Sequence, residues 1–165
     1  MAESLRSPRQ GWWLIGASFL LAFLISAIPL PEWISSFRPD WVALVLIYWC
    51  VALPDRVGPV VGMIVGLMMD VLQFTLLGHH SIGKSILGYL ANRFHLQIRN
   101  MPLWQQSLGV MALIAVDVAL VTWIHGILGT RSPSLGHWWP VVIGALFWPW
   151  VFLVLRDLRR RARVK

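Results

Sequence analysis

Charged residues and cysteine are scarce in this sequence. Of its 165 residues only 13% are charged, whereas 58% are hydrophobic. A soluble domain of this size could not bury so large an apolar fraction, so we expect a polytopic membrane protein. The single cysteine, Cys50, excludes a disulfide framework and a cysteine-rich zinc motif. No polar stretch is long enough to form a second domain, which predicts one membrane domain over residues 1–165.

Long apolar runs are abundant instead. They cover residues 12–30, 41–53, 57–77, 81–94, 103–128 and 138–155, and a basic tail covers 156–165. At 1.5 Å per residue the first run reaches about 28 Å, which spans a bilayer core. The second run is short, and the fourth is marginal because Lys84, Asn92 and Arg93 interrupt it. The pattern predicts an all-α integral membrane protein with about six transmembrane helices.

The positions of Lys and Arg predict the orientation, because positive residues near helix ends stay in the cytoplasm. Six crossings with both termini inside leave Arg38, Lys84 and Arg131 outside and the other 11 of the 14 basic residues inside. If the second and fourth runs are re-entrant, four crossings exchange Arg56 for Lys84 and keep the same count. Both termini are therefore predicted to be cytoplasmic, and the number of crossings stays open. The basic tail comprises Arg156, Arg159, Arg160, Arg161, Arg163 and Lys165.

Small residues recur every fourth position in two of the runs. Gly58, Gly62 and Gly66 lie on one face of the third run, and Ser18, Ala22 and Ser26 form a similar stripe in the first. Such stripes allow another helix backbone to approach closely. We expect each stripe to be a helix-packing surface, either within the chain or with a partner.

Four polar residues lie inside or near the apolar runs: Asp70, Asn92, Asp117 and His125. Carboxylates are costly in hydrocarbon, so Asp70 and Asp117 should point inward, protonated or hydrogen-bonded. A polar lock between helices and a proton or ligand site both remain open for them.

The octapeptide "GHHSIGKS" at 78–85 fits the phosphate-loop pattern G-x-x-x-x-G-K-[ST]. A phosphate loop follows a parallel strand in an α/β domain, whereas this one follows a glycine-striped membrane helix. His79 and His80 are adjacent and cannot form an i, i+4 metal pair. We therefore expect no cofactor, no metal and no enzymatic activity. The net charge of +7 lies largely in the tail, so nucleic acid is not an expected partner.

Residues 38–128 also carry short motifs in a fixed order. They are "RPD" at 38–40, "YW" at 48–49, "LPDRVG" at 53–58, the Gly62, Gly66 and Asp70 series, "LG" at 77–78, Tyr89 and "PLWQQ" at 102–106. In order and spacing they resemble the proteobacterial form of the MreD family of rod shape-determining membrane proteins.

The resemblance implies a non-enzymatic, multi-pass scaffold of the bacterial inner membrane. The implied partners in the cell-elongation machinery are an MreC-like periplasmic coiled-coil protein, an MreB-like filament, and the peptidoglycan glycosyltransferase and transpeptidase. The family's helical arrangement is similar to that of the substrate-binding subunits of energy-coupling-factor transporters. A small-molecule (vitamin-type) transporter subunit is therefore the alternative function, and a homo-oligomer stays open.

Overall fold

The computed structural model describes residues 11–29, 31, 37–129 and 135–162. Within them the chain forms α1 (Trp12–Ala27), α3 (Trp41–Ala52), α4 (Pro59–Leu72), α5 (His79–Arg93), α6 (His95–Asn100), α7 (Leu103–Ile127) and α8 (Trp139–Arg161), with a short 3-10 helix, η2 (Leu135–Trp138), before α8. No strand occurs in these residues, so the prediction of an all-α fold is confirmed for them.

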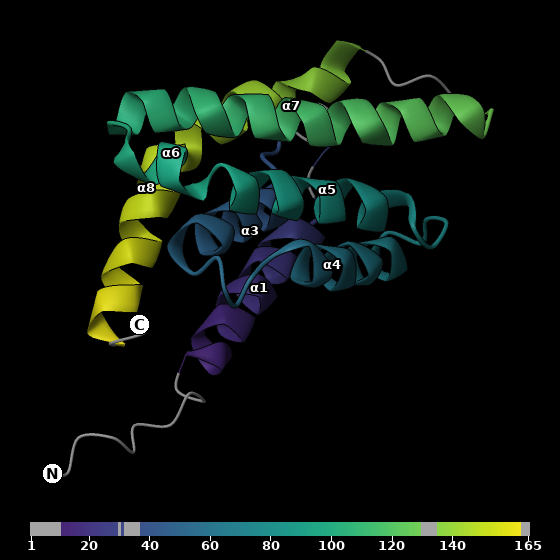
Figure 1. Ribbon diagram of the computed structural model, residues 1–165. Helices are drawn as coiled ribbons and strands as arrows, with labels where there is room; N and C mark the ends of the chain where they lie inside the picture. Colours follow the sequence, from purple (N-terminus) through teal and green to yellow (C-terminus); the bar gives the residue numbers. More distant parts are fainter. Residues whose placement is uncertain (1–10, 30, 32–36, 130–134, 163–165) are drawn as a thin grey trace, which may run out of the picture.

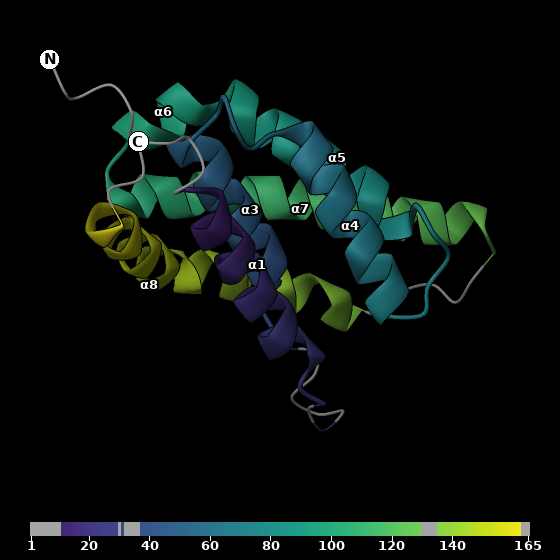
Figure 2. The ribbon, with the colours of Figure 1, turned by 90° about the horizontal axis from the view of Figure 1, so that it is seen from below.

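Helix α3 is the centre of the bundle. All ten residues from Val42 to Val51 are buried, and the helix contacts α1, α5, α6, α7 and α8 (Figures 1 and 2). A helix that is apolar on every side is stable only when other elements surround it. Helix α3 is 12 residues long, so it reaches about 18 Å, less than a bilayer core. Its short length and complete burial make it a core helix of the bundle.

The longer helices alternate in direction between two ends of the bundle. Arg38 at the start of α3 bonds to Ile25 O near the end of α1, and the ring of His79 at the start of α5 contacts that of His125 near the end of α7. At the opposite end, Arg159 of α8 donates to Ala52 O of α3 at 3.2 Å. The first turn of α1 and the last turns of α8 therefore lie at the same end (Figures 1 and 2).

Helices α4 and α5 form a hairpin held together by glycines. A Cβ added at Gly62 would collide with the carbonyl of Lys84, and one added at Gly66 would collide with Ser81. Near the base of the hairpin, a Cβ at Gly88 would lie 3.0 Å from Gly58 O. The glycine stripe of α4 thus lies against the backbone of α5, where a side chain on either helix would separate the two.

The small residues of α1 lie toward α3. Trp49 Nε1 donates to Ser18 Oγ at 2.8 Å, Ala22 is buried and Ser26 is half-buried. Both small-residue stripes therefore take part in contacts within the chain.

The helix ends differ from the predicted runs in several places. Helix α1 is shorter than run 12–30 and ends at Ala27. Helix α4 is shorter than run 57–77, because residues 73–78 form a turn. The helix that corresponds to run 81–94 is α5, which begins two residues earlier. Helix α6 follows it and was not predicted from the sequence. Helix α8 continues through Arg161, so most of the predicted basic tail is helical.

By length and composition α7 and α8 are each able to cross a membrane, whereas α1, α3 and α4 are shorter apolar helices.

We expect Gly66→Ala to destabilise the protein, because the new Cβ would overlap the Ser81 backbone. Overpacking of this kind costs about 1 to 3 kcal/mol. Less protein should accumulate in membranes, and it should unfold at a lower temperature in detergent. Gly126→Ala is the matched control, since apart from the neighbouring backbone of its own helix no described atom lies within 4 Å of its added Cβ. Equal unfolding temperatures for the two variants would contradict the close α4–α5 contact.

Candidate functional site

Three ionic residues, Lys84, Asp40 and Asp117, meet inside the bundle, and we call them the Lys84 cluster. Lys84 Nζ lies 2.5 Å from Asp40 Oδ2 and also donates to Asp117 Oδ2. Lys84 is 1% exposed and Asp117 is 3% exposed, whereas the Asp40 side chain is 19% exposed. The cluster joins the start of α3 to the middle of α5 and α7. Because a buried charge is costly unless it is paired, each of these residues depends on the others.

The local structure orients Asp40 and Asp117 toward Lys84. Asp40 is the N-cap of α3: its Oδ1 accepts from Ala43 N at 2.9 Å, which leaves Oδ2 for Lys84. Asp117 comes close to α5 at Gly83, where an added Cβ would lie 2.5 Å from Asp117 Oδ1. A side chain at position 83 would therefore push the Asp117 carboxylate away from its ammonium partner.

Asp70 organises the turn between α4 and α5. Its Oδ2 accepts from Gly78 N at 2.8 Å, and its Oδ1 accepts from His80 N at 2.8 Å. The same Oδ1 lies 2.8 Å from His80 Nδ1 and 3.2 Å from Thr75 Oγ1. Gly78 has a φ of +104°, a left-handed conformation that glycine adopts without strain. The carboxylate of the last turn of α4 thus binds the free N–H groups at the start of α5.

The two adjacent histidines have different neighbours. His80 bonds to Asp70, whereas the ring of His79 lies 4.0 Å from that of His125 in α7, centroid to centroid. Among the described residues, no three His, Cys, Asp or Glu side chains are grouped so that they could hold a metal ion.

Asn92 and the tail arginines lie at the other end of the bundle. Asn92 Nδ2 donates to Pro54 O at 3.0 Å and so ties the end of α5 to the α3–α4 turn. In the last turns of α8, Arg161 pairs with Asp157 at 2.7 Å, while Arg156 and Arg160 are exposed. Arg163 and Lys165 lie outside the described residues.

Sequence reasoning missed Lys84 and Asp40 as partners of Asp117. The charge count treats Lys84 as a loop residue, external with six crossings and cytoplasmic with four, whereas its side chain lies in the core. A lysine inside one apolar run and an aspartate inside another is the signal that could have paired them, since intramembrane charges usually pair.

The octapeptide "GHHSIGKS" now has a structural explanation. Gly78 makes the turn, His80 bonds to Asp70, and Lys84 bonds to two carboxylates. Ser81 packs against Gly66, and its Oγ donates to Met63 O at 3.1 Å. The lysine that a phosphate loop would offer to a nucleotide is bound within the chain.

We expect Lys84→Met to destabilise the protein more than Asp117→Asn. Methionine leaves two carboxylates facing each other in the core, whereas asparagine leaves the Lys84–Asp40 pair intact. Removing one partner of a buried ion pair costs about 3 to 5 kcal/mol. Thermal unfolding in detergent measures the loss. The double variant Lys84→Met/Asp117→Asn should lose less than the sum of the two single losses, and strictly additive losses would contradict direct coupling.

We expect Asp70→Asn to keep more stability than Asp70→Leu. Asparagine retains one acceptor oxygen for the N–H groups of Gly78 and His80, and leucine retains none. Each lost bond to a charged acceptor removes about 1.5 to 3 kcal/mol. Protein levels in membranes and the unfolding temperature check the order. Equal losses in both variants would show that the charge matters rather than the acceptor geometry.

Comparison with known proteins places the chain in a family. The family described as rod shape-determining protein MreD matches residues 7–158. A Haemophilus influenzae protein named rod shape-determining protein MreD is 32% identical over 157 residues, which cover 93% of this chain and 94% of that protein. No solved structure matches the chain. The chain belongs to the MreD family of rod shape-determining proteins.

Proposed function

We propose that this protein is a non-enzymatic, multi-pass scaffold of the bacterial inner membrane. In this role it would hold an MreC-like periplasmic coiled-coil protein, an MreB-like filament, and the peptidoglycan glycosyltransferase and transpeptidase in one assembly. Family membership supports the role in rod shape determination. The observation that carries the scaffold role is that the buried ionic groups bind one another and fix the helices. Such groups hold a shape rather than act on a substrate.

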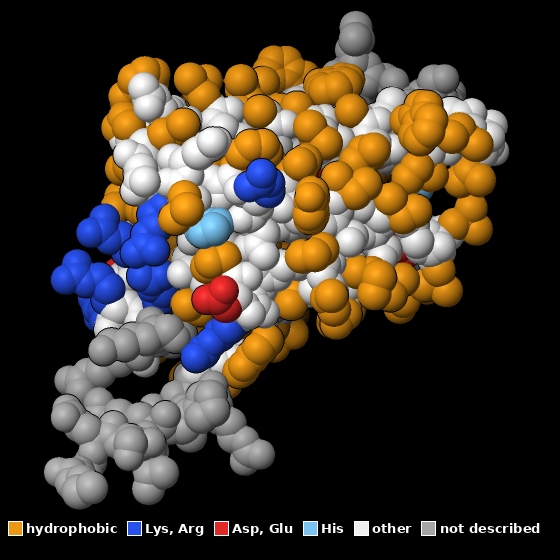
Figure 3. Space-filling model, viewed as in Figure 1, with side chains coloured by type: hydrophobic (Ala, Val, Ile, Leu, Met, Phe, Trp, Pro, Cys, Tyr) orange, Lys and Arg blue, Asp and Glu red, His pale blue; other side chains and the backbone are white. Residues whose placement is uncertain are grey.

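The apolar outer surface supports insertion of all the longer helices into the membrane. Large apolar side chains are exposed along α1, α4, α7 and α8, for example Leu20, Ile64, Trp123, Leu146 and Trp150. Apolar side chains are spread across the face seen in Figure 3, away from the basic cluster at its lower left. A soluble protein rarely exposes so continuous an apolar surface, whereas lipid is a suitable solvent for it. The alternating helix directions support six crossings.

The basic residues support cytoplasmic termini. One end of the bundle carries Arg56 in the α3–α4 turn, Arg93 and Arg99 at the ends of α5 and α6, and the arginines of α8. Basic side chains gather there in Figure 3. Retention of positive charge favours the cytoplasm for that end. There the arginines would also meet anionic headgroups, at about 1 kcal/mol per charge.

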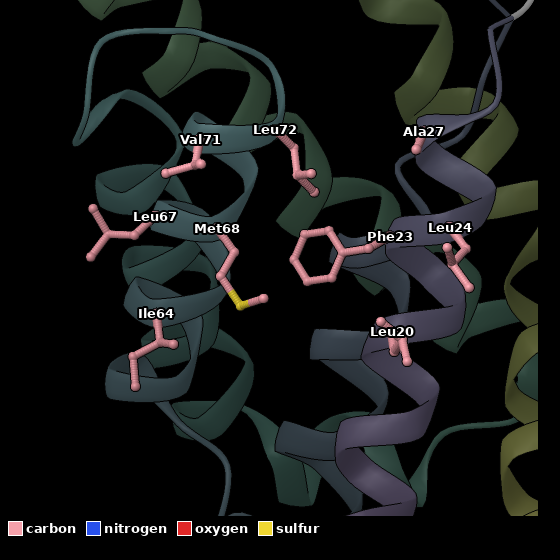
Figure 4. Close-up of a pocket in the computed structure, with 9 residues that line it drawn as sticks. All are labelled: Leu20, Phe23, Leu24, Ala27, Ile64, Leu67, Met68, Val71 and Leu72. Atoms are coloured by element: carbon pink, nitrogen blue, oxygen red, sulfur yellow. The ribbon is translucent and has the colours of Figure 1, made fainter.

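The transporter alternative receives less support. A groove of about 500 Å³ lies between α1 and α4, and its lining is Leu20, Phe23, Leu24, Ala27, Ile64, Leu67, Met68, Val71 and Leu72 (Figure 4). A vitamin-type ligand needs a few polar groups that fix its orientation. None of these nine side chains can donate or accept a hydrogen bond of ordinary strength.

Depletion in a rod-shaped host tests the role in shape. We expect rods to become round as the protein is lost, and a plasmid copy of the wild type or of Gly126→Ala to restore them. Light microscopy during depletion measures cell shape. Unchanged rods in a strain without a duplicate gene would contradict the proposal.

Crosslinking in membranes followed by affinity purification tests the partners. A periplasmic coiled-coil protein should be recovered with the wild type and with Gly126→Ala. Recovery of a nucleotide-binding energising subunit in its place would favour the transporter alternative.

A further inference from the structure

Exposed tryptophans lie near both ends of the bundle. Trp12 and Trp13 begin α1 and Trp104 lies in the first turn of α7, at the end where α8 finishes (Figure 1). Trp123 and Trp139 are exposed toward the opposite end. Tryptophan side chains concentrate where hydrocarbon meets the lipid headgroups. Trp104 and Trp123 are 19 residues apart in α7, which corresponds to about 28 Å, close to the thickness of a hydrocarbon core. The end that carries Trp104 therefore lies at the headgroup level of one leaflet.

The last turns of α8 carry arginines to the same end. Arg156 lies 17 residues after the exposed tryptophan that begins α8, which corresponds to about 26 Å. Arg156 and Arg160 are exposed, and Arg159 is half-buried. We call these three residues the α8 arginine site. In the part of the chain that the structure describes, none of them forms an ion pair, and the carboxylate of Asp157 in the same turns pairs with Arg161 at 2.7 Å. The site therefore has positive charge available for an anion.

The backbone of α3 holds Arg159 in place. Its Nη1 donates to Ala52 O, at the end of α3, at 3.2 Å. A guanidinium group has several further N–H donors, which remain available to a second acceptor. The oxygens of a phosphate match the planar fork of such a group. One arginine of the site is thus positioned before a ligand arrives, which lowers the entropic cost of binding.

Apolar side chains border the α8 arginine site on its membrane side. Leu153 and Val154 are exposed in the turn before Arg156, and Leu158 is exposed between the arginines. The exposed apolar face continues from Leu153 to Trp150, toward the middle of α8. An acidic protein in the cytoplasm would use only the charges of this region. A phospholipid has both a phosphate for the arginines and acyl chains for the apolar face, so the combination favours a lipid.

We propose that the α8 arginine site binds an anionic phospholipid, with the phosphate at the guanidinium groups and the acyl chains along Leu153 and Val154. This inference rests on the multi-pass orientation proposed above, which places this end of the bundle at the cytoplasmic leaflet. The site prefers a headgroup with net negative charge, because a zwitterionic headgroup carries its own cation and gains less from three arginines. The lipid also binds next to the α3–α8 contact made by Arg159.

Native mass spectrometry of the full-length protein in detergent tests the site. Phosphatidylglycerol or phosphatidylcholine is added, and the dissociation constant of the first bound lipid is measured for each. Arg156→Gln/Arg160→Gln removes two charges of the site. Arg93→Gln/Arg99→Gln is the matched control, because both of these arginines are exposed at the same end of the bundle but belong to α5 and α6. Equal unfolding temperatures without added lipid show that both variants fold.

We expect the wild type and the control to bind phosphatidylglycerol more tightly than phosphatidylcholine. Arg156→Gln/Arg160→Gln should bind phosphatidylglycerol about 30-fold more weakly than the wild type. Equal affinity of the wild type for the two lipids would overturn the inference, and an acidic protein would then be the better candidate for the site. Equal weakening in the two variants would also overturn it, because the charge of the whole end would then attract the lipid.

The orientation on which the inference rests has a separate readout. Labelling of Arg99→Cys in a Cys50→Ala background, from either side of the membrane, shows which side this end of the bundle faces. The lipid affinities are measured in detergent and do not depend on that result. Failure of the lipid site and failure of the proposed orientation are therefore distinguishable.

Discussion

The Lys84 ammonium, shared by Asp40 and Asp117, is the contact on which the arrangement of the bundle depends. It joins α5 to the start of α3, the buried central helix, and to α7. Apolar packing alone is weakly directional, particularly where lipid competes for the same surfaces. A buried charge can be satisfied in few geometries, so the cluster selects one register among the many that apolar helices could adopt.

The glycines of the α4–α5 hairpin provide the close helix packing that accompanies the Lys84 cluster. Gly62 and Gly66 bring the backbones of α4 and α5 together, and Gly83 makes room for Asp117 on the other side of α5. Helix α5 can thus approach α4 and α7 closely while it carries a long lysine. Asp70 closes the hairpin by binding the first N–H groups of α5. Residues 78–84 therefore serve close packing along their whole length, which explains two glycines and a lysine without any nucleotide.

Rod shape determination, the role of the MreD family, suits a molecule of this kind. The proposed scaffold role requires that the surfaces of the molecule keep fixed relative positions. Here the polar groups rigidify the interior, and the exterior offers apolar faces to lipid or to partner helices and a basic end to the cytoplasm under the proposed orientation. The small-residue stripes of α1 and α4 are used within the chain, so partner contacts would fall on faces that carry large side chains.

The sequence by itself determined the all-α class, the approximate positions of the apolar segments and the glycine face of α4, because these depend on local composition and period. The family resemblance rested instead on the order and spacing of the motifs at 38–128. The sequence did not determine that the run at 41–53 is the buried centre, that α6 follows α5, or that α8 extends through Arg161. Only the tertiary structure decided that Lys84 meets Asp40 and Asp117, residues 44 and 33 positions away along the chain. The physical reason is that charge pairing and backbone approach depend on how distant helices pack, and a one-dimensional pattern contains the groups but not their distances.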